Sequence, residues 1–155
     1  MGEKPAAVLF ACTMNSVRSP MAEGILKHYH GRQIYVDSVG VRAGEPVGFM
    51  AQVMDEFGID MSRHKSKTFA DLEDTSYDLV ISLSPEAQHS AVELTRTMAC
   101  EVEYWPTFDP SVVTGSRDVM LDAYRQLRGD LIKRILDRFS LEAPPGNENI
   151  GLGGR

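Results

Sequence analysis

Cys12 and Arg18 stand near the two ends of a short polar segment, with five residues between them. A cysteine thiolate is a nucleophile, and nearby positive groups favour that form of the side chain. Arginine presents a planar pair of N–H donors that matches two oxygens of a phosphate group. The segment therefore predicts a phosphate-binding loop in which Cys12 attacks phosphorus. We expect the phosphate to be bound by the loop residues Thr13, Met14, Asn15, Ser16, Val17, Arg18 and Ser19.

The spacing of Cys12 and Arg18 is weak evidence for a phosphate-binding loop by itself, but the position of the segment along the chain supports this interpretation. Residues 6–11 form a continuous apolar run, typical of a buried strand, and Ser19-Pro20 marks the start of a helix. Backbone N–H groups at such a turn bind anions and lower the pKa of a neighbouring thiol. Ser19 can donate a hydrogen bond to the sulfur, and Asn15 can hold the loop in shape. An inert buried thiol at Cys12 is the alternative interpretation.

A thiolate mechanism also needs an acid to protonate the leaving group and a base to activate water. Asp109 is the best candidate, because it follows a predicted strand and can reach the same edge of the sheet as Cys12. Its neighbours Trp105 and Phe108 could raise its pKa. The alternative is a surface Asp-Pro turn, a common use of this residue pair.

The rest of the chain alternates between strand and helix patterns. This order predicts an α/β fold in which a parallel sheet carries helices on both faces. Ligands bind such sheets beyond the carboxyl ends of the strands, where the loop at Cys12 lies. Further strands are predicted at residues 34–39, 77–83 and 101–105, and further helices from Pro46 to Gly58, after a cap at Ser84, and from a cap at Ser116 to Phe139.

Composition narrows the function classes. The chain has 155 residues, which suggests one domain over residues 1–141, followed by a Pro- and Gly-rich flexible tail over residues 142–155. A net charge of -6 argues against a nucleic-acid partner, and the longest apolar run, residues 6–12, is too short to span a membrane. Two cysteines make no disulfide framework, and free thiols fit the cytoplasm.

Several segments of this chain resemble the low-molecular-weight protein tyrosine phosphatases. The resemblance covers about residues 6 to 139, and Asp109-Pro110 stands where that family keeps its general acid. It implies a three-layer α/β fold with a four-stranded parallel sheet in the order 2-1-3-4. The segments that carry it are Val8 to Cys12, Asn15, Arg18 to Gly24, Asp37 to Gly40, Gly44 to Pro46, and Phe57 to Ser62 with His64.

The resemblance also implies roles for individual residues. Cys12 is the expected nucleophile, Arg18 the phosphate ligand and Asp109 the acid and base. Asn15, Ser19 and Ser38 are the expected loop supports, and no metal or other cofactor is required. The implied partner is a phosphorylated protein or a small phosphoester substrate. The implied oligomeric state is a monomer or weak dimer.

The chain departs from the family pattern at several positions. Met14 replaces a common glycine, and Ser16 and Val17 replace a second loop cysteine. Ser111 and the residue after it stand where tyrosines often follow the Asp-Pro pair. Residues 41–43 lack an aromatic side chain, and Arg42 among them could favour an anionic substrate. Phosphotyrosine protein is the expected substrate, and a small phosphoester or a phosphoarginine-like group stays open.

Two other functions stay open. Arsenate reductases of the same fold use two further cysteines after the third strand, but residues 82–89 contain none and Cys100 is alone. Reduction of arsenate by an external thiol therefore remains an alternative, as does a non-catalytic phosphate-binding module.

The histidines and the basic run predict no separate site. His28, His30, His64 and His89 lack the spacing of metal ligands. His64 could brace the loop near Ser38, and we expect the basic run at residues 63–67 to be a solvated loop.

Overall fold

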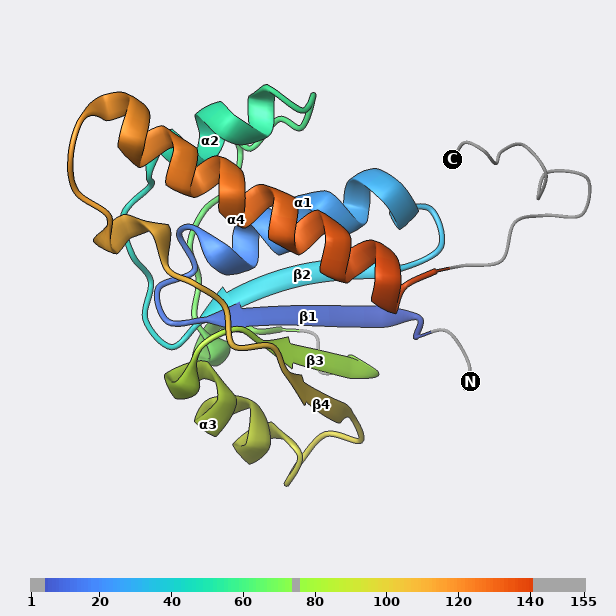
Figure 1. The fold of residues 1–155 in the computed structure, drawn as a ribbon. Helices are drawn as coiled ribbons and strands as arrows, with labels where there is room; N and C mark the ends of the chain where they lie inside the picture. The colour runs from blue at the N-terminus through green and yellow to red at the C-terminus, as the bar shows by residue number, and fades with distance from the viewer. Residues whose placement is uncertain (1–4, 74–75, 141–155) are drawn as a thin grey trace, which may run out of the picture.

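The computed structural model describes residues 5–73 and 76–140 (Figure 1). Its centre is a four-stranded sheet in the order β2-β1-β3-β4, and all three strand pairings are parallel. The predicted fold class is confirmed. The expected tail at residues 142–155 lies outside the described residues. The strands are β1 (Ala7–Cys12), β2 (Tyr35–Gly40), β3 (Leu79–Ser82) and β4 (Glu101–Tyr104).

Helices cover both faces of this sheet (Figure 1). Three of them, α1 (Arg18–His30), α2 (Gly48–Asp55) and α4 (Arg117–Arg138), share one hydrophobic core with the sheet. The fourth, α3 (Pro85–Leu94), packs on the other face. None of the helices in the described ranges is long and apolar enough to cross a membrane.

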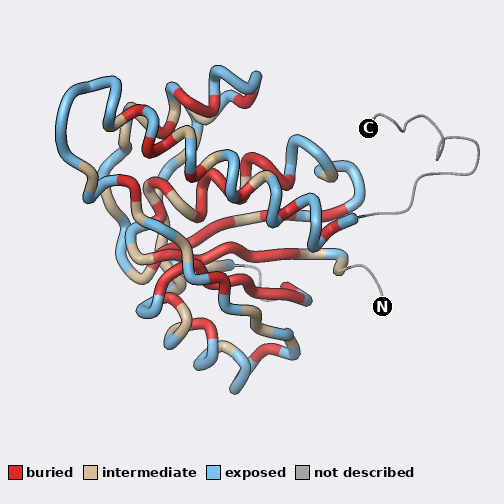
Figure 2. Tube along the Cα trace, in the orientation of Figure 1, coloured by how far each residue is buried: buried red, intermediate tan, exposed pale blue. Residues whose placement is uncertain are grey.

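β1 lies inside the molecule, as its continuous apolar sequence predicts (Figure 2). Val8 and Phe10 point into the core under α1 and α4, whereas Leu9 and Ala11 point into the core under α3. This alternation follows from the period of two along a strand. Cys12 is the last residue of β1, so it lies at the carboxyl edge of the parallel sheet.

The helix ends agree with their sequence signals. Ser84 and Ser116 each accept a hydrogen bond from the backbone three residues later, so both predicted caps are confirmed. Gly58 has φ of 80°, and the Ile59 N–H bonds to the Met54 carbonyl at 3.0 Å, closing the turn after α2. α1 begins at Arg18, slightly earlier than Ser19-Pro20 predicts.

Candidate active site

Cys12 ends β1, and α1 begins at Arg18, so the loop spans residues 13–17. The Cys12 side chain is 2% exposed. Its Sγ lies 2.9 Å from the Ser19 hydroxyl and accepts a hydrogen bond from the Ser19 N–H at 3.4 Å. The first turn of α1 thus directs two polar groups at the sulfur.

The Ser19 hydroxyl has two acceptors for its single hydrogen. It lies 3.3 Å from the carbonyl oxygen of Val39 as well as 2.9 Å from the Cys12 sulfur. A thiol at Cys12 can donate to Ser19, which then donates to Val39. A thiolate cannot donate, and Ser19 then donates to the sulfur. This arrangement accommodates both protonation states without moving a heavy atom.

Asn15 is the buried centre of the loop. It has φ of 53°, a left-handed conformation that Asn tolerates better than most residues. Its Nδ2 donates to the hydroxyls of Ser19 at 2.8 Å and Ser38 at 3.0 Å, and its Oδ1 accepts from the Lys67 N–H at 2.9 Å. The three expected loop supports, Asn15, Ser19 and Ser38, therefore lie together in one hydrogen-bonded group.

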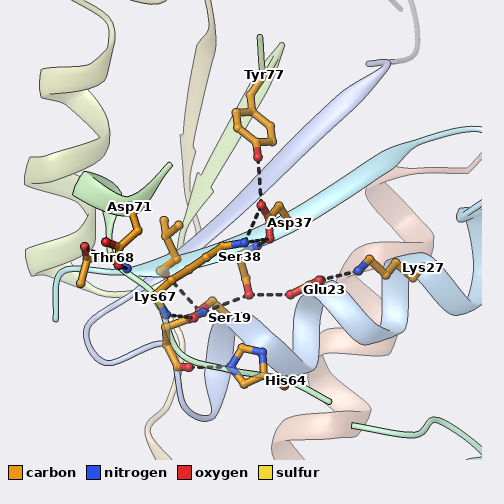
Figure 3. Close-up of polar contacts among 12 residues, drawn as sticks. Ser19, Glu23, Lys27, Asp37, Ser38, His64, Lys67, Thr68, Asp71 and Tyr77 are labelled. Atoms are coloured by element: carbon orange, nitrogen blue, oxygen red, sulfur yellow. Dashed lines mark hydrogen bonds and ion pairs between the residues drawn. The ribbon is translucent and has the colours of Figure 1, made fainter. Parts of the chain in front are cut away.

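The direction of these hydrogen bonds is set by Glu23 on α1 (Figure 3). A carboxylate only accepts, so the Ser38 hydroxyl donates to Glu23 Oε1 at 2.6 Å and must accept from Asn15. Lys27 donates to the other oxygen of Glu23 at 2.6 Å. No sequence signal pointed to Glu23 or Lys27 as supports of the loop. Their spacing along α1 indicates only an ordinary ion pair between successive helix turns.

The basic run at residues 63–67 supports the loop from another side. Both His64 Nε2, at 2.8 Å, and the Ser66 hydroxyl, at 2.7 Å, contact the carbonyl oxygen of Asn15 (Figure 3). His64 therefore braces the loop through Asn15, which is itself hydrogen-bonded to Ser38. Burial is the largest single influence and lowers the pKa of Lys67, but the hydrogen bond to Asp37 and the negative charges of Asp37 and Glu23 together leave that pKa above its ordinary value.

Gly40 allows the loop to approach β2. A Cβ placed on Gly40 would lie 2.7 Å from the Asn15 nitrogen and 2.6 Å from the Arg42 carbonyl oxygen. Such contacts are too short for any side chain, so this position requires glycine. Gly40 directly follows the strand predicted at residues 34–39, so a glycine at a strand end was visible in the sequence. The sequence does not say which atoms approach this glycine.

Residues 41–44 run along the loop and hold its outer carbonyls. Met14 is 39% exposed, and only Asn15 among the non-glycine residues of the described ranges has a positive φ. The backbone therefore accepts the side chain of Met14 without strain. The supporting hydrogen bonds run from Val41 N to Cys12 O, from Arg42 N to Thr13 O and from Gly44 N to Met14 O.

The carbonyls at the start of the loop accept hydrogen bonds, whereas the N–H groups of residues 14–18 have no acceptor within the described part of the chain. Successive unpaired N–H donors beside a helix N-terminus are suited to the oxygens of an anion.

Arg18 and Asp109 meet across the loop despite their separation in sequence. Arg18 Nη1 donates to the carbonyl oxygen of Thr107 at 3.0 Å, and its Nη2 lies 3.9 Å from Asp109 Oδ2. Asp109 Oδ1 accepts from the backbone N–H and hydroxyl of Ser111 at 3.0 and 2.7 Å. One carboxylate oxygen is thereby held by Ser111, and the other faces the arginine.

The aromatic surroundings of Asp109 differ from the expected ones. Trp105 is 4% exposed and packs edge-on against Phe10, so its role is in the core. Tyr124 of α4 is the aromatic residue that Asp109 influences, because burial and then the charge of Asp109 raise the Tyr124 pKa. The Phe49 ring lies 5.5 Å from that of Tyr124. Tyr124 lies in the helix predicted from Ser116 to Phe139, and no sequence signal pointed to Tyr124 or Phe49 as neighbours of the site.

Arg42 does not offer a free positive charge. Its Nη2 lies 3.0 Å from a carboxylate oxygen of Glu86 on α3, and both side chains are about half exposed. The pairing reduces the attraction for a substrate anion that the sequence suggested.

Cys100 lies far from Cys12. Strand register places it about five residues back from Cys12 along the sheet, roughly 16 Å at about 3.3 Å per residue, and two strands across. A disulfide needs Cα atoms within about 7 Å. Burial raises the pKa of the Cys100 thiol. Among the described residues, no group of three or more His, Cys, Asp or Glu side chains could hold a metal ion.

Comparison with known proteins gives one family and two kinds of relative. Residues 7–141 match the family "Low molecular weight phosphotyrosine protein phosphatase". An arsenate reductase of Halalkalibacterium halodurans is 33% identical over 83% of this chain and 91% of its own length. A glutaredoxin arsenate reductase of Synechocystis is 31% identical over 83% and 92%. The solved low-molecular-weight protein tyrosine phosphatase of T. tengcongensis is 29% identical, with a TM-score of 0.64, and the match covers 85% and 98% of the two chains.

Proposed function

The chain belongs to the low-molecular-weight phosphotyrosine protein phosphatase family, and on that premise we propose that it hydrolyses phosphate monoesters through a phosphocysteine on Cys12. One observation carries this proposal. The Ser19 hydroxyl and N–H converge on the Cys12 sulfur, while Arg18 and Asp109 meet beside the same loop. A buried structural thiol would need neither the two polar groups nor the carboxylate.

The first step forms a bond between the Cys12 sulfur and phosphorus and breaks the ester P–O bond. Asp109 gives its proton to the departing oxygen. The negative charge of the transferring group spreads over three oxygens, which the loop N–H groups and the Arg18 guanidinium stabilise. Because Asp109 Oδ2 lies 3.9 Å from Arg18 Nη2, the acid stands beside the bound phosphoryl group.

The second step releases phosphate. Asp109, now a carboxylate, takes a proton from water, which attacks phosphorus and breaks the S–P bond. The sulfur leaves as a thiolate, and the Ser19 hydroxyl turns from the Val39 carbonyl to donate to it. The second donor, the Ser19 N–H, needs no rearrangement.

We infer protein phosphotyrosine as the substrate class. An aryl group bound above the loop would meet Phe108, which is 45% exposed, and the exposed end of Met14. A small aryl phosphate would use the same surfaces. We further infer that the chain works in the cytoplasm as a monomer or weak dimer, with no nucleic-acid or membrane partner.

Burst and steady-state kinetics with 4-nitrophenyl phosphate test this proposal. Cys12→Ser should abolish both the burst and the turnover, whereas Cys100→Ser should retain both. Asp109→Asn should slow phenyl phosphate more than 4-nitrophenyl phosphate, because the poorer leaving group depends more on a proton donor. Wild-type turnover in Cys12→Ser would refute the phosphocysteine, and an equal loss on both substrates would refute the role of Asp109.

Arsenate reduction is a second candidate, favoured by the identity to two arsenate reductases. Arsenate is a tetrahedral oxyanion like phosphate and suits the same N–H donors. The chain holds 2 cysteines and Cys100 is remote, so an external thiol must supply the reducing electrons. Arsenite formation that requires glutathione or glutaredoxin, without hydrolysis of aryl phosphates, would select this candidate.

A further inference from the structure

Two adjoining hollows open beside the support of the phosphate-binding loop. Their volumes are about 420 and 400 Å³, within the range of small-molecule sites. Both are lined by Glu23, Lys27, Arg63 and His64, whereas Cys12 and Arg18 line neither. They are therefore separate from the candidate active site.

Positive charge is concentrated in the second hollow. Four cationic side chains line it, against the carboxylates of Glu23 and Asp37. Those two carboxylates already pair with Lys27 and Lys67 at 2.6 and 2.7 Å. In a chain with a net charge of -6, this local excess of positive charge needs a separate explanation. The four cations are Lys27, Arg63, Lys65 and Lys67.

Arg63 and Lys65 carry the unpaired part of this charge. Within the described ranges neither forms an ion pair, and both are exposed. Asp60 also lines the first hollow, where it accepts a hydrogen bond from the Ser62 N–H at 2.9 Å and forms no ion pair with Arg63 within the described residues. That hydrogen bond, with a smaller contribution from the charge of Arg63, lowers the Asp60 pKa. Two cationic donors on alternate residues of one segment are thus available to an anion.

We propose that the two hollows form a second anion-binding site for a small phosphorylated molecule. Arg63 and Lys65 bind its phosphate group, with the planar guanidinium taking two oxygens. Its apolar part lies in the first hollow against Ile59 and Met61. A concave site of this size favours a small molecule over a protein surface.

The site adjoins the loop without touching the reacting atoms. His64 and Ser66, which alternate with the two cations, contact the Asn15 carbonyl oxygen at 2.8 and 2.7 Å. The basic run is therefore more than the solvated loop that its sequence suggested: His64 and Ser66 hold the phosphate-binding loop, and all five residues from 63 to 67 line the second hollow.

Calorimetric titration with phenylphosphonate, a phosphate-like dianion that is not hydrolysed, tests the proposal at low salt. Arg18→Met should abolish binding of phenylphosphonate at the candidate active site, so one binding event, at the second site, should remain. Adding Arg63→Ala and Lys65→Ala should weaken that event at least about tenfold, which is about 1.4 kcal/mol. Adding Arg32→Ala and Lys133→Ala removes the same charge from exposed positions outside both hollows and should leave the affinity unchanged.

The unmodified chain gives an independent measurement if the Arg18 variant does not fold. Wild type should bind phenylphosphonate at two sites, and the Arg63→Ala, Lys65→Ala variant at one. A single site in wild type, or an equal loss in the control pair, would overturn the proposal. Turnover of 4-nitrophenyl phosphate by Arg63→Ala, Lys65→Ala should persist. Failure of this second site and failure of the proposed hydrolysis are therefore distinguishable.

Discussion

Replacing Asn15 by alanine should remove the central support of the phosphate-binding loop. The change deletes hydrogen bonds to Ser19, Ser38 and the Lys67 N–H, each buried or partly buried. Each such bond contributes about 1 kcal/mol net. An alanine in a left-handed conformation costs about 1 kcal/mol more. We therefore expect the free energy of unfolding to fall by about 4 kcal/mol.

Two further variants at Asn15 separate the loss of hydrogen bonds from the cost of the left-handed backbone conformation. Asn15→Gly loses the same hydrogen bonds but adopts the φ of 53° freely, so it should be about 1 kcal/mol more stable than Asn15→Ala. Asn15→Asp keeps an acceptor for Lys67 but cannot donate to the two serines. Its negative charge beside the loop should weaken phosphate binding even if the protein stays folded.

Urea unfolding gives the stabilities, and competitive inhibition of 4-nitrophenyl phosphate turnover by inorganic phosphate gives the binding. Thr95→Ala, which removes an exposed hydrogen bond at the end of α3, serves as the control and should cost less than about 0.5 kcal/mol. If Asn15→Ala and Asn15→Asp both retain wild-type stability and phosphate inhibition, the buried network does not hold the loop.

Three further predictions concern other parts of the chain. Gly40→Ala should cost about 1–3 kcal/mol and most of the turnover, because its Cβ would lie 2.7 Å from the Asn15 nitrogen; unchanged urea unfolding would contradict this. Two arginines of α4 lower the pKa of Glu56 from 4.5 to about 2, so the stability it contributes is present above about pH 4.5 and lost as pH falls toward 2. Glu56→Gln should therefore shrink the difference in unfolding free energy between pH 7 and pH 3. Cys100→Ser should not alter oxidation of Cys12, and non-reducing mass spectrometry of the oxidised wild type should show no intramolecular disulfide.

Local patterns were sufficient to predict the sheet and helices. The apolar run before Cys12 predicts a buried strand, and Ser84 and Ser116 predict helix caps; each signal lies within a few residues of its effect. The predicted strand order also agrees with the structure, but it came from family resemblance rather than from periodicity. Hydrophobic patterns say which residues are buried, not which strand lies beside which.

The reacting groups of the candidate site were predictable from local signals. Residues 12–19 follow one another between a predicted strand and a predicted helix, and Asp109 follows a predicted strand, so both could be assigned to the same edge of the sheet. Glu23 and Lys67 could not be assigned, because Glu23 supports Asn15 only through Ser38 of β2, and Lys67 binds Asn15 from the distant basic run. Long-range partners of a buried polar group leave no periodic signal.

Met14 and Arg42 both depart from the family pattern at positions that bear on substrate choice, and their structural consequences differ. Met14 keeps an ordinary backbone conformation and adds exposed apolar surface beside the loop, which supports an aryl substrate. Arg42 is paired with Glu86, so it adds little attraction for an anion. The unpaired cations, Arg63 and Lys65, instead stand beside the loop support. On the proposed function, selectivity at Cys12 should therefore depend less on the charge of Arg42 than on shape and apolar contact.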